Sequence, residues 1–229
     1  MRKLFIIFLL FVFHKTLLNA EIIKKVQITG NKRVSNETVM IYGEININKN
    51  YTEQDINSVL NNLYKTNFFE NVNLEFSNGV LKVNLVEYPI ISNLIILGEA
   101  SNKYQESIKK IIELKEKDSF IENRLKQDIE KIKKLYAGIG FNFVNIDTKI
   151  KKIDARSIDL IFEIDKGKLT KIKKISFVGD KKIREKRLRD VITSQEAKFW
   201  KFFSRNVYLN KERVELDTRL LKNYYKNKG

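Results

Sequence analysis

A glycine-centred pattern occurs three times in the chain and restricts its fold more than any other feature. In each copy a short run of alternating apolar residues ends at a glycine, and two amphipathic segments follow; the glycines are Gly30, Gly98 and Gly179. Alternation with a period of two is typical of a strand with one buried face, and glycine ends such a strand because it reaches positive φ without a steric penalty. The spacing of the copies indicates tandem small domains rather than a solenoid of shorter repeats.

The first copy, residues 21–88, carries start signals for two helices after its strand. Ser35 is placed to cap a short helix, and Thr52 with Asp55 three residues later forms a variant of the capping box for a second helix. Apolar residues of the second segment recur at helical spacing, which gives one buried stripe. The sequence therefore predicts two helices after the first strand.

A hairpin signal completes the first copy. Alternating runs at residues 72–76 and 81–85 flank the pair Asn78-Gly79, which is typical of a two-residue hairpin turn. The order of elements is therefore β-α-α-β-β, and the predicted class is α+β. The only proline, Pro89, marks the boundary with the next copy because it cannot donate to a strand ladder.

The second copy, residues 89–167, repeats the same order. Ser119 and Glu122 match a capping box before its second helix. Residues 141–151 and 158–164 then supply another hairpin, whose second arm alternates clearly. We expect a second domain of the same architecture.

The third copy, residues 168–229, begins like the others. Ile175 and Phe177 alternate before a glycine, which predicts a strand, and two helical segments follow. Gly229 aligns with Gly140 of the second copy, so the hairpin of the other copies is not present. We interpret this copy as an incomplete domain in a truncated reading frame.

An aromatic segment, KFWKFF, lies between the two helices of the third copy. Large aromatic side chains are usually buried, so packing within the domains is the simpler interpretation. The alternative is a docking patch for a partner, formed by Trp200, Phe202 and Phe203.

The composition argues against an enzyme. The chain has no cysteine, and its one histidine is His14, close to the N-terminus. His14 lies within the predicted leader, so a mature protein would have neither residue, no Ser-His-Asp or Cys-His relay and no common zinc site. No paired carboxylate or lysine constellation is apparent, so we predict no catalytic residue, no metal site and no cofactor.

Residues 1–20 are typical of a secretory signal peptide. Arg2 and Lys3 precede a wholly apolar run, and Ala20 is a small residue at the expected cleavage point. An uncleaved membrane anchor is the alternative. The net charge of +16 fits binding to nucleic acid, binding to an anionic membrane surface, or simply a lysine-rich proteome. Export to the periplasm would exclude the first of these interpretations.

The residues after the leader resemble POTRA domains, most closely those of the outer-membrane β-barrel assembly factors. Four stretches carry the resemblance: VQITGNKRVSNETV (26–39), LYKTNFFENV (63–72), LYAGIGF (135–141) and the run from Lys198 to Gly229. The last resembles the third POTRA domain of that family, which has an aromatic insert before a helix. The matching positions are Tyr208, Asp217, Leu221, Tyr225 and Gly229.

The resemblance implies a mixed three-stranded sheet in each domain, in the order 1-3-2, with two helices on one face. The second strand of each domain is then an open edge, to which extended chains can add by β-augmentation. We expect partner binding at two such edges; the candidate residues are Val72, Leu74 and Phe76 in the first domain and Asn142, Val144 and Ile146 in the second.

The family also implies partners and a place in the cell. The partners are unfolded outer-membrane β-barrel proteins, accessory lipoproteins of the assembly complex and a periplasmic chaperone, at the periplasmic side of the outer membrane. Membrane attachment through a C-terminal barrel would lie outside this sequence. A translocation-and-assembly or two-partner-secretion transporter is an alternative, and a basic nucleic-acid-binding protein is a remote one.

Overall fold

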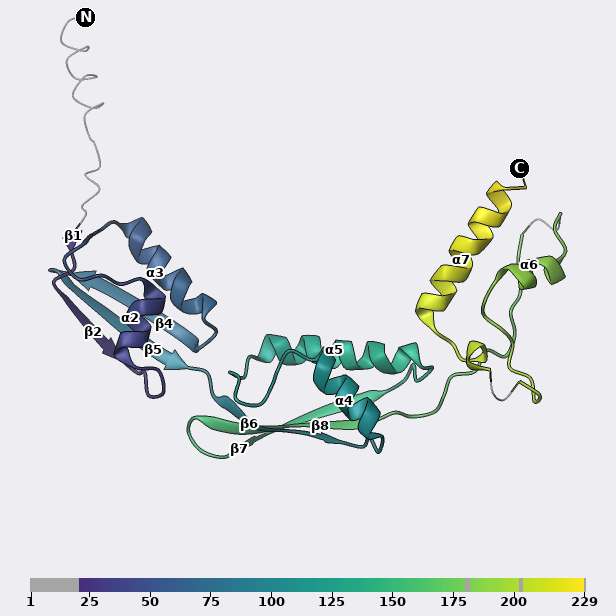
Figure 1. Cartoon of the computed structure of the whole chain (residues 1–229), viewed down its shortest axis with the longest axis horizontal. Helices are drawn as coiled ribbons and strands as arrows, with labels where there is room; N and C mark the ends of the chain where they lie inside the picture. Colours follow the sequence, from purple (N-terminus) through teal and green to yellow (C-terminus); the bar gives the residue numbers. More distant parts are fainter. Residues whose placement is uncertain (1–20, 180–181, 202–203, 229) are drawn as a thin grey trace, which may run out of the picture. The chain divides into compact units, whose positions relative to one another are not determined.

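The computed structural model describes residues 21–179, 182–201 and 204–228 of the 229-residue chain. The predicted leader lies outside these ranges. Tertiary contacts divide the chain between Tyr88 and Pro89 into two compact units. Each unit contains a three-stranded sheet with helices on one face (Figure 1), which confirms the α+β class.

The first unit has a mixed sheet with its last strand in the centre. Its elements are β1 (Glu21–Ile22), β2 (Lys25–Thr29), α2 (Asn36–Gly43), β3 (Asn50–Tyr51), α3 (Glu53–Lys65), β4 (Phe69–Ser77) and β5 (Val80–Glu87). Strand β5 is parallel to β2 and antiparallel to β4, while β1 and β3 form a separate short ladder. The sheet order β2-β5-β4 is the 1-3-2 order expected from the resemblance.

Both helices of the first unit begin where the sequence predicts. The Ser35 hydroxyl accepts the Thr38 N–H at 3.2 Å before α2. Before α3, Thr52 Oγ1 accepts the Asp55 N–H at 3.3 Å and the Asp55 carboxylate accepts the Thr52 N–H at 2.8 Å. Hydrogen bonds from Thr52, first from its side chain, hold the pKa of Asp55 below its usual range. The capping box is confirmed.

A close contact between strand ends explains the first two of the repeated glycines, Gly30 and Gly98. Gly30 follows β2 with φ +85°, and a Cβ there would lie 1.9 Å from the Leu85 carbonyl oxygen. Gly98 in the second unit has φ +82°, and its Cβ would lie 2.0 Å from the Ile164 carbonyl oxygen. Only glycine, which has no Cβ, lets the end of the first strand come this close to the central strand.

The second unit repeats the sheet and then continues into a helical region. Its elements are β6 (Ile90–Leu97), α4 (Asn102–Ile111), α5 (Glu122–Gly138), β7 (Asn145–Lys152), β8 (Ser157–Asp165), α6 (Glu185–Val191), the 3-10 helix η1 (Arg205–Val207) and α7 (Lys211–Lys226). Strand β8 is central, parallel to β6 and antiparallel to β7. The 1-3-2 order is therefore present again.

A buried polar cluster lies at the exit of β6. Glu99 is only 4% exposed, and its carboxylate accepts the Tyr136 hydroxyl at 2.6 Å and the Lys166 ammonium at 3.3 Å. Burial by itself would raise the pKa of Glu99, but these bonds and one from the Ser101 N–H lower it overall. Burial and the Glu99 carboxylate raise the pKa of Tyr136 well above its usual value. The cluster ties the end of α5 to the sheet.

The capping box predicted at Ser119 and Glu122 is wrong. Helix α5 does begin at Glu122, but its N-cap is Ile121 and no side chain caps it. Ser119 is buried and forms an isolated bridge with Ile90, while the Phe120 N–H donates to the Pro89 carbonyl. This segment runs extended beside the start of β6, so the Ser119 hydroxyl is not available to the helix.

The strand predicted at Ile175 and Phe177 is also absent, since no strand is found within 173–179 of the described residues. The Ile175 N–H donates to Glu196 Oε1 at 2.9 Å, and the Ile175 carbonyl accepts from the Arg189 guanidinium. The side chains of Glu196 and Arg189 thus form the hydrogen bonds to the Ile175 main chain that a neighbouring strand would otherwise form. An alternating sequence forms a strand only where a second strand supplies the ladder.

A carboxylate contact recurs in the two helix pairs of the second unit. Asp128 of α5 accepts the N–H groups of Glu113 and Leu114, at 2.7 and 2.9 Å, in the segment after α4. Asp217 of α7 accepts the N–H groups of Thr193 and Ser194, at 2.6 and 3.2 Å, in the segment after α6. The two segments begin with similar extended residues, Ile112 and Ile192. The same device therefore joins both helix pairs.

Candidate functional site: two open strand edges

Strand β4 is an edge of the first sheet, and its turn fixes which main-chain groups face outward. Asn78 and Gly79 both have positive φ, 50° and 72°, as a type I′ turn requires. Such a turn is closed by a hydrogen-bonded pair, here Ser77 and Val80, and the pairs then alternate along the ladder. The N–H and C=O groups at the predicted positions Val72, Leu74 and Phe76 therefore point away from β5.

One of these three outward donors already has a partner within the first unit. The Val72 N–H donates to the Tyr64 hydroxyl of α3 at 3.1 Å. Among the described residues, no hydrogen bond reaches the N–H groups of Leu74 and Phe76. The Val72 side chain is buried at 5% exposure and belongs to the core. A partner could therefore bind the main-chain N–H and C=O groups of this edge between Leu74 and the turn.

Strand β7 is the corresponding edge in the second unit. The Ile153 N–H donates to the Ser157 carbonyl at 3.0 Å, which closes the hairpin and sets the alternation. The outward groups are therefore those of Ile146, Thr148, Ile150 and Lys152. No hydrogen bond to these four N–H groups is present in the part of the chain that the structure describes. Thus β7 is open over a longer stretch than β4.

Of the predicted β7 residues, only Ile146 is in the strand. Strand β7 begins at Asn145 because Asn145 pairs with Asp165, the last residue of β8. Asn142 and Val144 precede it, which corrects the predicted strand start at residue 141. The Asn142 side chain instead donates to the Leu209 carbonyl at 2.9 Å.

The turn before β7 forms a junction with the region after residue 168. The Thr170 N–H donates to the Gly140 carbonyl at 2.9 Å, and the Asn210 side chain donates to the Gly138 carbonyl at 2.9 Å. Gly140 has φ +99°, and a Cβ there would lie 2.8 Å from Tyr208 Cβ. These contacts occupy the turn, so the open part of the edge starts at β7 itself.

The opposite edge of the second sheet is partly covered. The Ile91 N–H donates to the Asp118 carbonyl at 2.9 Å, and the Ile91 carbonyl accepts the Lys117 N–H at 2.7 Å. The Leu94 N–H also donates to the Glu116 carboxylate at 3.2 Å. The segment before α5 thus occupies the first half of β6, and β7 is the more accessible edge of this sheet.

The two open edges differ in charge. The sequence of β4 contains Glu70 and Glu75 and no basic residue. Strand β7 carries Lys149, Lys151 and Lys152, of which Lys149 pairs with Glu163 across the ladder at 2.7 Å. Lysine on an edge strand discourages pairing with another copy of the same edge. The two edges therefore present different surroundings to an incoming chain.

The aromatic segment is exposed where it is described. Phe199 is 87% and Trp200 58% exposed, with their rings edge to face at 4.5 Å between centroids. Burial of Trp200, the simpler expectation, is therefore wrong, and a docking role remains a prediction. Phe202 and Phe203 lie outside the described residues.

The described residues contain no group of three histidine, cysteine or carboxylate side chains that could hold a metal ion. None of the helices in these ranges is long and apolar enough to cross a membrane.

The arrangement of two helices on a 1-3-2 sheet agrees with a comparison against protein families. The model named POTRA, described as "Surface antigen variable number repeat", matches residues 89–167 and 170–229. These matches cover more than half of the chain, and the chain belongs to the POTRA family.

Similar curated proteins include outer membrane protein assembly factors named BamA. The chain is 29% identical to that of Neorickettsia risticii over 92% of this chain and 28% of the relative. It is 27% identical to that of Neisseria meningitidis serogroup B over 90% of this chain and 26% of the relative. The chain thus spans about a quarter of the length of these relatives. The names of both relatives describe them as assembly factors.

Among solved structures, POTRA domains 3–5 of Haemophilus influenzae BamA match 92% of this chain and 89% of that one. The identity is 14% and the TM-score 0.42, which adds nothing to the family assignment.

Proposed function

We propose that the chain is the periplasmic POTRA region of an outer-membrane protein assembly factor, and that it binds unfolded outer-membrane β-barrel proteins by β-augmentation. The names of its relatives support the assembly role. The observation that carries the proposal is the pair of open edges, above all the unpartnered outward groups of β7. Accessory lipoproteins and a periplasmic chaperone would use the same kinds of surface.

Main-chain pairing suits a factor that accepts many different substrates. An incoming strand bonds to N–H and C=O groups that every sequence possesses, so little depends on its side chains. Each such bond contributes about 0.5–1.5 kcal/mol net, and ordering the incoming chain offsets part of this. Binding at one edge is therefore weak and reversible, which allows a substrate to be passed on.

The domain organisation is part of the proposal. Residues 21–88 and 89–167 would be the first two POTRA domains, and 168–229 part of a third. The recurring contact of Asp128 and Asp217 supports the assignment of 168–229 as a further copy. Residues 1–20 would direct export to the periplasm.

Proline substitution on β7 tests the role of its edge. Ile150→Pro removes one outward N–H on an edge strand, where proline is tolerated, at a side chain that is 46% exposed. Ile150→Ala removes most of the same side chain but keeps the N–H and is the matched control. The probe is a ten-residue peptide of alternating apolar and polar residues, like a membrane β-strand, with binding followed by fluorescence anisotropy.

We expect Ile150→Pro to weaken peptide binding about fivefold or more relative to Ile150→Ala, with a similar melting temperature. Equal binding by the two variants would exclude β7 as the site. Loss of binding in both would assign it to the side chain instead of the main chain.

A further inference from the structure

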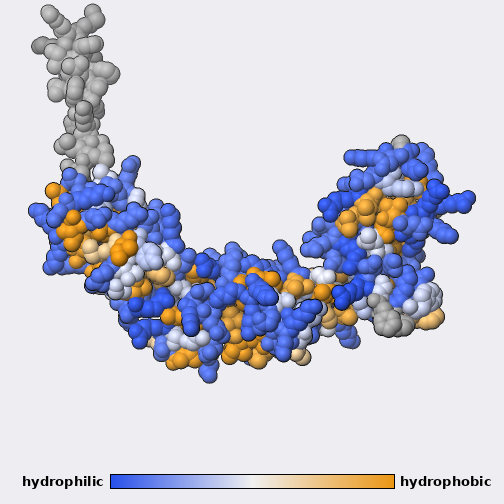
Figure 2. All heavy atoms as spheres, viewed as in Figure 1, coloured by the Kyte–Doolittle hydropathy of each residue, from blue (hydrophilic) through white to orange (hydrophobic). Residues whose placement is uncertain are grey.

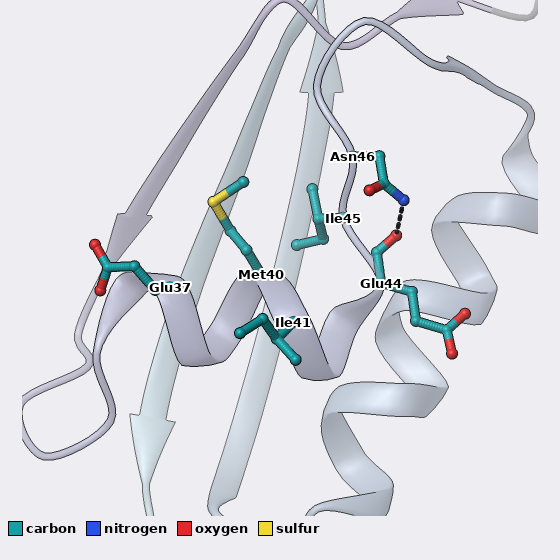
Figure 3. Close-up of a pocket in the computed structure, with 6 residues that line it drawn as sticks. All are labelled: Glu37, Met40, Ile41, Glu44, Ile45 and Asn46. Atoms are coloured by element: carbon teal, nitrogen blue, oxygen red, sulfur yellow. Dashed lines mark hydrogen bonds between the residues drawn. The ribbon is translucent and has the colours of Figure 1, made fainter.

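An apolar pocket lies along α2 in the first unit, on a helix that takes no part in the strand edges. It has a volume of about 580 Å³ and is lined by Glu37, Met40, Ile41, Glu44, Ile45 and Asn46. Figure 3 shows Met40, Ile41 and Ile45 between two glutamates that lie toward opposite ends of the helix. The pocket therefore has an apolar centre and an acidic residue at each end.

The apolar centre is unusually open to solvent. Ile41 is 73% exposed, and the nearby Tyr42 and Ile47 are 49% and 48% exposed. Ile45 forms the floor and is buried at 4% exposure. Apolar side chains grouped at a surface hollow mark a place where another apolar side chain can bind.

The two glutamates have no basic partner in the described part of the chain. No ion pair of Glu37 or Glu44 is present among the described residues, although the chain has 44 basic and only 28 acidic residues. Backbone hydrogen bonding in the first turn and the Ser35 side chain keep the pKa of Glu37 below its usual value, so it is charged at neutral pH. Both carboxylates are available to a cation from outside.

Glu44 is unfavourable for the helix that it ends. It is the C-cap of α2 in the left-handed conformation, φ 54°, where glycine or asparagine is preferred. A negative charge at a helix C-terminus also opposes the helix dipole. The Glu44 carbonyl accepts from the Asn46 side chain and the Tyr51 hydroxyl, at 3.2 and 3.1 Å, which fixes the backbone while the carboxylate points away (Figure 3). The stability of α2 therefore does not explain why a glutamate occupies position 44.

The spacing of the glutamates defines the occupant. Glu37 and Glu44 are seven positions apart, which corresponds to a rise of about 10.5 Å along a helix. In an extended chain, residues i, i+2 and i+4 share one face and span about 13 Å, so three alternate side chains fit the acidic–apolar–acidic line. We propose that the pocket binds an extended segment of a partner protein that presents basic, apolar and basic side chains on one face.

Two synthetic peptides test the proposal on the full chain labelled with ¹⁵N. The probe is acetyl-Ser-Lys-Ser-Ile-Ser-Lys-Ser-amide, and the control replaces both lysines with glutamate. We expect the lysine peptide to shift the amide resonances of residues 37–46, and raised salt to weaken the effect. The glutamate peptide should leave these resonances unchanged. Equal binding of both peptides, or shifts confined to β4, would overturn the proposal.

Matched charge variants separate the pocket from the general charge of the chain. Glu37→Gln with Glu44→Gln should weaken the lysine peptide about fivefold. Glu70→Gln with Glu75→Gln changes the net charge equally on β4 and should leave binding unchanged. Equal weakening by both pairs would mean non-specific attraction and overturn the proposal.

Sedimentation equilibrium without peptide tests a different occupant. A monomer is expected. Self-association that the Glu37→Gln, Glu44→Gln variant abolishes would assign the pocket to a second copy of the chain and overturn the partner assignment.

Discussion

Helices α5 and α7 make the same carboxylate contact but differ in how their apolar faces are covered. Asp128 and Asp217 each bind two N–H groups of the segment after the preceding helix. Around Asp128, helix α5 buries Leu125, Ile132 and Tyr136. In α7 the described buried residue is Asp217 alone, and apolar atoms gather at the surface of this region (Figure 2). The exposed side chains include Val214, Leu216 and Tyr225, at 42, 38 and 43%.

The carboxylate contact is local, whereas burial of the apolar stripe depends on tertiary structure. The carboxylate contact needs only two helices and the segment between them, and these are present in both regions. Burial of the apolar stripe needs a sheet beneath the helices, which α5 has in β6, β7 and β8. Helix α7 therefore forms with an apolar stripe, but little of that stripe is buried to stabilise the helix. We expect α7 to exchange its amide hydrogens faster than α5.

The largest effect is expected from the repeated glycines. Gly98→Ala would place a methyl group against the Ile164 carbonyl at positive φ, which should cost about 3 kcal/mol or more in the β6–β8 sheet. In Gly179→Ala the added Cβ would meet no atom within 4 Å among the described residues, so we expect only the cost of its strained φ of +123°, about 1 kcal/mol. Hydrogen exchange of the sheet and of α7 in each variant measures this. Equal costs would mean that Gly179 also packs against a strand.

A smaller difference is expected from the two aspartates. Asp128→Ala leaves the Glu113 and Leu114 N–H groups unpaired in a buried site, at about 2–3 kcal/mol. Asp217→Ala leaves the Thr193 and Ser194 N–H groups without their acceptor on a helix that has little apolar packing around it, and we expect a smaller loss of about 1 kcal/mol. Urea denaturation followed by circular dichroism gives both values. A larger loss at Asp217 would contradict the view that α7 lacks a core.

The smallest effect is expected from pH. Burial would raise the pKa of Asp217, but hydrogen bonds from Ser194 and Thr193 outweigh it and lower the pKa in the folded state. A lowered folded-state pKa contributes stability above the unfolded value of about 3.9, and this stability is lost as the pH falls through the folded value. The chain should therefore become less stable between pH 5 and 3, and Asp217→Asn should reduce this dependence. Melting temperatures of both proteins across this range provide the measurement, and parallel curves would exclude Asp217 as the source.

Local features were predictable from sequence because their causes are local. The caps at Ser35 and Thr52, the Asn78-Gly79 turn and the helical stripes involve residues a few positions apart. The capping box at Ser119 failed because Pro89 and Ile90, distant in sequence, hold that segment in an extended form. Pattern alone cannot distinguish a serine that is free to cap from one that is already engaged.

The candidate site was predictable only in part. The resemblance indicated the edge strands, and β4 and β7 are edges. The outward phase depends on how each hairpin closes, and the Tyr64 contact with Val72 depends on how α3 lies on the sheet. Asp128 was missed, although a carboxylate within an apolar helical stripe is a signal for a buried polar contact.

The sequence by itself determined the repeat and the order of helices and strands in the first two copies, because periodicity and glycine positions encode them directly. The order of strands within each sheet came from the resemblance. Only the tertiary structure decided which alternating segments became strands. Residues 90–97 form β6 because β8 pairs with them, whereas Ile175 and Phe177 alternate in the same way and remain outside any strand. A strand exists through hydrogen bonds to a neighbour, and that neighbour is a property of the fold and not of the segment.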